Sequence, residues 1–205
     1  MKFDGTFEID NVSLEEVWLA LSDPYMIKAS LPGCQFLVPV EDGGDVDFEQ
    51  LRTEAENDGE DPPILPDATP EDVAERAFVE GNTYATLIEL SVGNVKPSFE
   101  STVTITERDF PRMSAAGEGS AANSAFEMSA WMELSEVEDG VAVEWEAEAD
   151  VFGKIAQLGG RVIKPVANRV VKRFFDQVAD RLKEVGDAAE EETQSSLRDR
   201  VSGLF

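Results

Sequence analysis

The chain has 205 residues, of which 43 are Asp or Glu and 17 are Lys or Arg, so its formal net charge is −26. This balance argues against nucleic acid as a partner, because phosphate binding needs a basic surface. The sequence has no histidine, so the commonest general acid–base group and metal ligand is absent. It has a single cysteine, Cys34, which excludes an intrachain disulfide.

The acidic residues are spread along the whole chain and are not confined to one tail. A domain with carboxylates over its entire surface repels itself at low salt, and it is tolerated where salt screens charge within a few ångströms. We therefore predict a protein adapted to a high-salt cytoplasm, with an ordinary acidic protein as the alternative. The N-terminus has no signal-peptide pattern and no apolar run is long enough to span a bilayer, so we expect a cytoplasmic location.

The N-terminal segment predicts one strand followed by two short helices. Apolar and polar residues alternate over 3–9, which is typical of a half-buried strand. Ser13 and Glu16 have the spacing of a capping box at the start of a helix. Pro24 interrupts that helix, and the second one ends near Pro32.

Residues 41–76 form an acidic insertion that is rich in Asp, Glu, Pro and Gly. Because such a segment buries little apolar surface, we expect it to be a partly disordered loop on the surface. One short helix is predicted within it, capped by Thr69 and begun by Pro70. A solvated loop without a function of its own is the simpler interpretation of this insertion.

Alternating strands resume after the insertion and lead into a long amphipathic helix. The whole pattern predicts an α+β domain with a curved antiparallel sheet of about six to seven strands, closed by the C-terminal helix. One apolar stripe of that helix is predicted at steps of three and four residues. Its members are Ile155, Leu158, Val162, Val166, Val170, Phe174, Val178 and Leu182.

No catalytic constellation, metal-ligand spacing or phosphate loop stands out. The inward strand positions mix large and small residues, which leaves apolar-lined room for a hydrophobic ligand under the helix. The alternative is that the helix and loops fill this space. The predicted lining residues are Phe99, Val103, Phe126, Met128, Trp145, Ala147 and Ala149 on strands, with Val170 and Phe174 on the helix.

The long helix carries a disproportionate share of the basic residues. These cations either compensate the protein's own acidic surface or form a patch for an acidic partner or for anionic lipid headgroups. The predicted docking residues are Arg161, Lys164, Arg169, Lys172 and Arg173.

We place the domain at residues 1–186 and an acidic tail at 187–205. The tail ends in a short segment with Leu197, Val201, Leu204 and Phe205, which either frays or docks on a partner or membrane surface.

Several motifs together resemble the family of the carbon monoxide dehydrogenase G subunit. They are Met1-Lys2-Phe3-Asp4-Gly5, Leu31-Pro32-Gly33-Cys34, residues 92–103, Gly117-Glu118-Gly119, residues 149–159 and Phe174-Phe175. The resemblance spans most of the chain outside the acidic insertion and the tail.

This family belongs to the START-like helix-grip (SRPBCC) superfamily. The resemblance implies a non-enzymatic accessory protein that binds a lipophilic molecule, such as a quinone, and has no resident cofactor. It also implies that the protein tethers a molybdenum-containing CO dehydrogenase-like hydroxylase to the inner face of the membrane. Cys34 is then expected to be a buried structural thiol. A polyketide cyclase- or hydratase-like enzyme and a pure interaction module with a filled core are the two other hypotheses.

Overall fold

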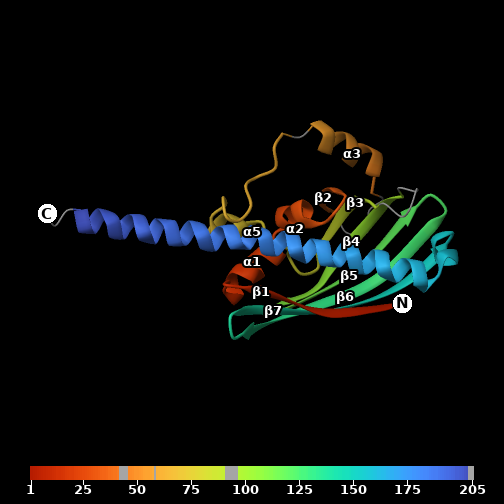
Figure 1. Ribbon diagram of the computed structural model, residues 1–205. Helices are drawn as coiled ribbons and strands as arrows, with labels where there is room; N and C mark the ends of the chain where they lie inside the picture. Colours follow the sequence, from red (N-terminus) through yellow and green to blue (C-terminus); the bar gives the residue numbers. More distant parts are fainter. Residues whose placement is uncertain (42–45, 58, 91–96, 203–205) are drawn as a thin grey trace.

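The computed structural model describes residues 1–41, 46–57, 59–90 and 97–202, with side chains as far as Lys183. Seven antiparallel strands form one curved sheet in the order β1-β7-β6-β5-β4-β3-β2 (Figure 1). The predicted α+β class, the antiparallel sheet and the long C-terminal helix are confirmed. The strands are β1 (Lys2–Asp10), β2 (Cys34–Val40), β3 (Thr83–Glu89), β4 (Ser98–Asp109), β5 (Arg112–Ala121), β6 (Ser124–Val137) and β7 (Gly140–Gly153).

Two short helices connect the edge strands β1 and β2, as predicted. Helix α1 (Leu14–Ser22) begins with the expected capping box. The backbone N–H of Glu16 donates to the Ser13 hydroxyl at 3.2 Å, and the N–H of Ser13 donates to the Glu16 carboxylate at 2.7 Å. Helix α2 (Pro24–Ser30) follows directly, and Asp23 caps its first turn.

The acidic insertion contains two helices, α3 (Phe48–Asn57) and α4 (Pro70–Glu75). Thr69 caps α4, which confirms the predicted start of that helix. Helix α3 was not predicted. It covers the outer face of the sheet, where Phe48, Leu51 and Ala55 pack against a small cluster of Phe36, Ala85 and Leu87 on β2 and β3. The partial disorder expected for the insertion stays a prediction.

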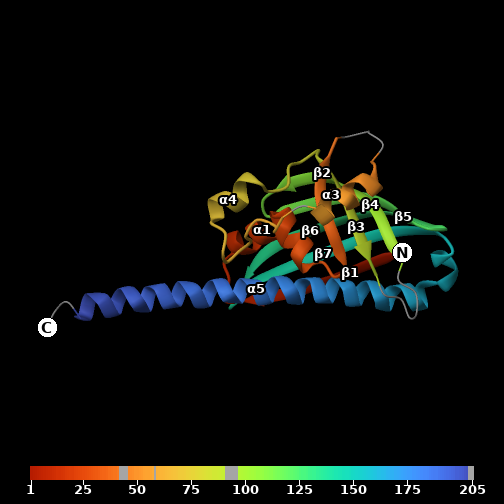
Figure 2. The same ribbon diagram turned by 90° about the horizontal axis from the view of Figure 1, so that it is seen from above.

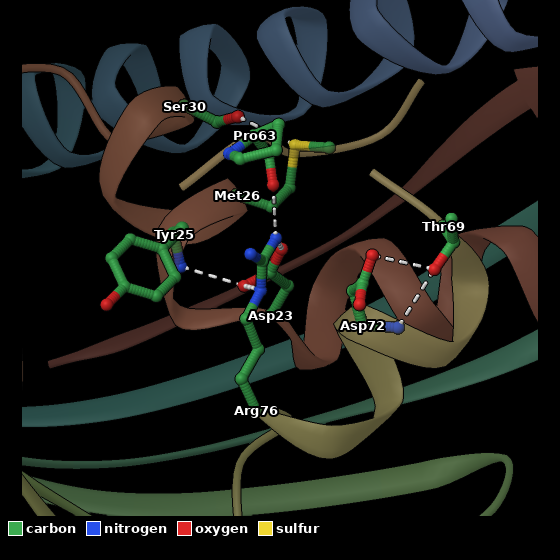
Figure 3. Close-up of polar contacts among 8 residues, drawn as sticks. All are labelled: Asp23, Tyr25, Met26, Ser30, Pro63, Thr69, Asp72 and Arg76. Carbon is green, nitrogen blue, oxygen red and sulfur yellow. Dashed lines mark hydrogen bonds and ion pairs between the residues drawn. The ribbon is translucent and has the colours of Figure 1, made fainter. Parts of the chain in front are cut away.

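A buried ion pair ties the end of the insertion to the corner between α1 and α2 (Figure 3). The Arg76 guanidinium donates to both carboxylate oxygens of Asp23, at 3.0 and 2.6 Å. Arg76 also donates to the carbonyl of Pro63 at 2.8 Å, and the N–H of Tyr25 donates to Asp23 at 3.0 Å. Since Asp23 is fully buried, this pair fixes the insertion against the helical layer.

The C-terminal helix does not begin where the apolar pattern predicted. Residues Ile155–Leu158 form a separate 3₁₀ turn, η1. Gly159, with a φ of +69°, separates this turn from the helix that follows. Helix α5 runs from Gly160 to Ser202 and extends well beyond the sheet (Figure 2). The predicted stripe was therefore wrong at its start: Leu158 lies before the break, outside α5, and both Leu158 and Val162 are exposed.

The structure also differs from the prediction in which of the two adjacent phenylalanines is buried. Phe175 is buried and stacks on Phe7 of β1, with ring centroids 5.2 Å apart. Phe174, which was predicted to face the sheet, is only half-buried and meets Phe175 edge-on at 5.1 Å. The division of the chain into a domain of residues 1–186 and a tail stays a prediction.

Candidate functional site

The concave face of the sheet is identified by strand register. Phe7 of β1 lies opposite Val143 of β7, which lies opposite Leu134 of β6. Because side chains alternate between faces, every second residue from these positions points to the same side. Phe7, Leu134 and Val143 all pack in the main core together with Phe175 of α5, so this is the face that α5 covers.

The two ends of this face differ in burial. At one end, which we call the closed half, the inward strand residues are buried and pack against the buried part of α5; they are Ile105, Met113, Leu134, Val141 and Val143, with Phe175, Val178 and Leu182. At the other end, which we call the open half, most inward residues of β6, β7 and α5 are apolar but only half-buried. Its strand residues are Val103, Phe126, Met128, Ala130, Ala147, Ala149 and Val151, and its helix residues are Ile163, Val166, Ala167 and Val170.

The open half contains most of the lining residues predicted from the sequence. Val103, Phe126, Met128, Ala147, Ala149 and Val170 all belong to it. Phe99 is buried beside it and meets Phe126 edge-on, with ring centroids 5.9 Å apart. Trp145 and Phe174 pack against the closed half and stand at the boundary between the two. Ile163 and Ala167, one turn apart on α5, also belong to the open half but were not predicted, because the predicted stripe ran through the neighbouring Val162 and Val166.

Two hydroxyl groups interrupt this apolar surface on its β3–β4 side. Thr86 and Ser101 lie directly opposite each other on β3 and β4 and are both buried. The Thr86 hydroxyl is 3.5 Å from the thiol of Cys34, and that thiol donates to the carbonyl of Phe36 at 3.4 Å. Burial raises the pKa of the Cys34 thiol above its usual value, so the thiol is kept in its uncharged form.

A separate depression of about 260 Å³ lies on the outer face, over β1, β7 and β6. Its side chains include Lys2, Thr6, Trp131, Glu144 and Glu146, which alternate out of phase with the concave residues. The depression is largely polar and crossed by an ion pair of 2.7 Å between Lys2 and Glu146. We assign no lipophile to it, because an apolar ligand would leave these charges without water.

The predicted docking residues lie together on the exposed surface of α5. Arg161, Lys164, Arg169, Lys172 and Arg173 are all exposed. Residues 151–175 hold six Lys or Arg and no Asp or Glu, although acids outnumber bases in the chain as a whole. The same segment exposes three large apolar side chains, namely Phe152 (49%), Leu158 (47%) and Val162 (41%). We call Phe152, Leu158 and Val162, with the neighbouring Lys154, Arg161 and Lys164, the basic tip.

Sequence comparison gives one family match that covers about half of the chain. Residues 75–183 match the model of the family of the carbon monoxide dehydrogenase G subunit, CoxG. The chain belongs to the CoxG family. The matched region runs from the end of α4 through β3–β7 to the part of α5 that covers the sheet, so it includes the open half and the basic tip. A comparison with curated proteins finds no match.

Solved structures of low sequence identity share the CoxG chain's fold. A conserved protein from Geobacillus kaustophilus is 17% identical with a TM-score of 0.63, over 92% of this chain and 97% of that chain. A protein from Thermus thermophilus is 10% identical with a TM-score of 0.55, over 90% and 98%. The Zhui aromatase/cyclase from Streptomyces sp. R1128 is 9% identical with a TM-score of 0.52, over 88% and 86%. These likenesses establish the helix-grip fold.

None of the helices in the described part of this CoxG protein is both long enough and apolar enough to cross a membrane.

Proposed function

We propose that this CoxG-family protein binds a lipophilic molecule on the open half of its concave face and acts as an accessory protein without catalytic activity. The observation that carries the proposal is the pairing of two half-buried apolar surfaces, one on β4, β6 and β7 and one on α5. Packed cores normally bury such side chains, as the closed half does. A lipophile between the two surfaces would remove the remaining apolar area from water.

The expected gain in binding free energy is substantial. Each 100 Å² of apolar surface removed from water contributes roughly 2.5 kcal/mol, and a drug-sized ligand covers several times that area. Small side chains at Ala147 and Ala149 provide room, because no Cγ projects from β7 at these positions. The ligand class is therefore an apolar molecule of modest thickness, and a quinone-like molecule has these properties.

The proposal extends to a protein partner and to the membrane. The CoxG family is linked to carbon monoxide dehydrogenase, which is an oxidoreductase. We propose that this protein docks a molybdenum-containing CO dehydrogenase-like hydroxylase in the cytoplasm and holds it at the inner face of the membrane. The basic tip supports the membrane contact, since exposed apolar groups flanked by cations suit an interface with anionic lipid.

Ligand binding is tested with N-phenyl-1-naphthylamine, a dye that becomes fluorescent in apolar sites. Ala147→Phe fills the open half and is expected to abolish saturable dye binding while the protein stays folded. Ala116→Phe is the matched control, because Ala116 is exposed on the outer face of β5. Equal dye binding by wild type and Ala147→Phe would remove the proposed site. No dye binding by wild type would instead favour the interaction module with a filled core.

Membrane contact is tested by co-sedimentation with phosphatidylglycerol vesicles. The double substitution of Phe152 and Leu158 by Ser is expected to reduce the bound fraction several-fold. Val79→Ser is the control, since Val79 is also an exposed apolar residue but precedes β3 and lies outside the basic tip. Retention of binding by the double variant would show that the basic tip does not face the lipid.

A further inference from the structure

We infer that Ser101 forms a polar subsite on the β4 side of the open half, where it donates a hydrogen bond to an oxygen atom of the bound lipophile. This inference rests on the proposed function and adds to it the chemical class of the ligand. The ligand is amphipathic, with a hydrogen-bond acceptor such as a carbonyl oxygen at its buried end. Its apolar part then lies across β6 and β7, over Met128 and Ala149 of the open half.

The first observation is an unpartnered hydroxyl. Ser101 is 3% exposed, and its Oγ has no hydrogen-bond partner among the residues that the structure describes. Buried hydroxyl groups are normally paired, because losing water without a replacement partner destabilises the protein. A buried hydroxyl that stays unpaired in the free protein is suited to a ligand that supplies the missing acceptor.

The second observation is the position of that hydroxyl. Ser101 pairs with Gly119 of β5, and a Cβ at Gly119 would collide with the Ser101 Oγ. The ring of Phe126 lies over the same space, 2.7 Å from that Cβ position. The hydroxyl therefore lies on the concave face above a bare glycine, directly beside a lining residue of the open half.

Phe126 controls access to this hydroxyl. Its ring is half-buried and touches Phe99 edge-on, whereas Ser101 beneath it is buried. Binding at the hydroxyl therefore requires the Phe126 side chain to turn away from Ser101, toward the half-buried residues of β6 and β7. The aromatic ring would then lie against the apolar part of the ligand.

The hydroxyl group directly opposite Ser101 already has a contact. The Thr86 hydroxyl contacts the thiol of Cys34 at 3.5 Å. Ser98, also on β4, has an unpaired Oγ too, but it alternates to the outer face of the sheet. Ser101 is thus the group positioned to bind an acceptor inside the site, and Ser98 provides a control of the same chemical type.

The test compares two dyes of similar size on the full-length protein. Prodan carries a ketone, and its emission moves to longer wavelength when the ketone oxygen accepts a hydrogen bond. N-phenyl-1-naphthylamine has no carbonyl. Ser101→Ala is expected to weaken prodan binding about 3- to 10-fold, the usual range for one hydrogen bond, and to shift bound prodan to shorter wavelength. Binding of N-phenyl-1-naphthylamine should change less than about twofold, and Ser98→Ala should alter neither dye.

The outcomes separate this subsite from the proposed carrier function. If Ser101→Ala leaves prodan affinity and emission unchanged while wild type binds both dyes, the subsite is overturned and the carrier function stands. Equal losses for both dyes would also overturn it, because they would indicate a change in packing. Failure of wild type to bind either dye would overturn the carrier function itself. Melting temperatures of the two Ala variants at or above the wild-type value would show that their folds are intact.

Discussion

Helix α5 offers a matched pair of valines, one in each half of the concave face. Val178 is 0% exposed in the closed half, whereas Val166 is half-buried in the open half. Val178→Ala removes two fully buried carbon groups, which costs about 1.6 kcal/mol in transfer free energy. The cavity left behind raises the cost to about 2–3 kcal/mol. Both substitutions gain the same helix propensity, roughly 0.5 kcal/mol, so their difference isolates burial.

Val166→Ala should change the free energy of unfolding by less than about 1 kcal/mol, because it loses less burial and the gain in helix propensity offsets much of that loss. Ligand binding should show the opposite order. Val166→Ala is expected to weaken binding of N-phenyl-1-naphthylamine several-fold, and Val178→Ala should leave it within about twofold. Urea unfolding and dye titration on both variants measure the two quantities. Similar stability losses at the two sites would refute the division into a closed and an open half.

Three further predictions concern the rest of the molecule. Arg76→Met should lower the free energy of unfolding by about 3–5 kcal/mol, because Asp23 would be left buried without its partner; a loss below about 1 kcal/mol in urea would show that the pair is dispensable. Thermal melts should move to higher temperature between low and molar potassium chloride, since the Debye length falls to about 3 Å at 1 M; a melting temperature independent of salt would remove the high-salt interpretation. Cys34 should react with iodoacetamide more slowly than free cysteine at pH 8, and its rate should rise only at higher pH, because burial raises the thiol pKa and keeps the reactive thiolate scarce. A rate equal to that of free cysteine would show that the thiol is accessible and its pKa unshifted.

The strands and caps were predictable because their signals are local. Residues 3–9 alternate with a period of two, and β1 has the same alternation of exposed and inward positions. The capping box needs only Ser13 and Glu16, three residues apart, and both of its hydrogen bonds are present. Such patterns depend on neighbouring residues alone and are independent of the tertiary contacts.

The missed features depend on contacts between distant segments. Helix α3 packs on β2 and β3 through Phe48, Leu51 and Ala55, but its acidic neighbours conceal this sparse apolar face in the sequence. The burial of Phe175 follows from its stacking on Phe7, a residue of the first strand. The sequence indicated a weak point at Gly159-Gly160, yet the reset of helical phase there follows from the positive φ of Gly159.

Most residues of the candidate site could be predicted from the sequence, but the difference in burial between its two ends could not. Alternation identifies Met128, Ala147 and Ala149 as inward residues. Their partial exposure, in contrast to the burial of Val143 on β7, depends on packing by segments that are distant in the sequence, such as α5. The burial of the unpaired Ser101 hydroxyl likewise depends on Gly119 of β5 and Phe126 of β6, which come later in the chain than β4.

The most direct test of the carrier function is a ¹³C-methyl NMR titration of the protein with N-phenyl-1-naphthylamine. The dye is expected to shift the methyl signals of Val103, Met128 and Val166 in the open half. The signals of Met113, Val143 and Val178 in the closed half should move little, since those residues are buried in the packed core. Shifts confined to the closed half or to the outer face, or no shifts at saturating dye, would contradict the proposal that the open half is the ligand site.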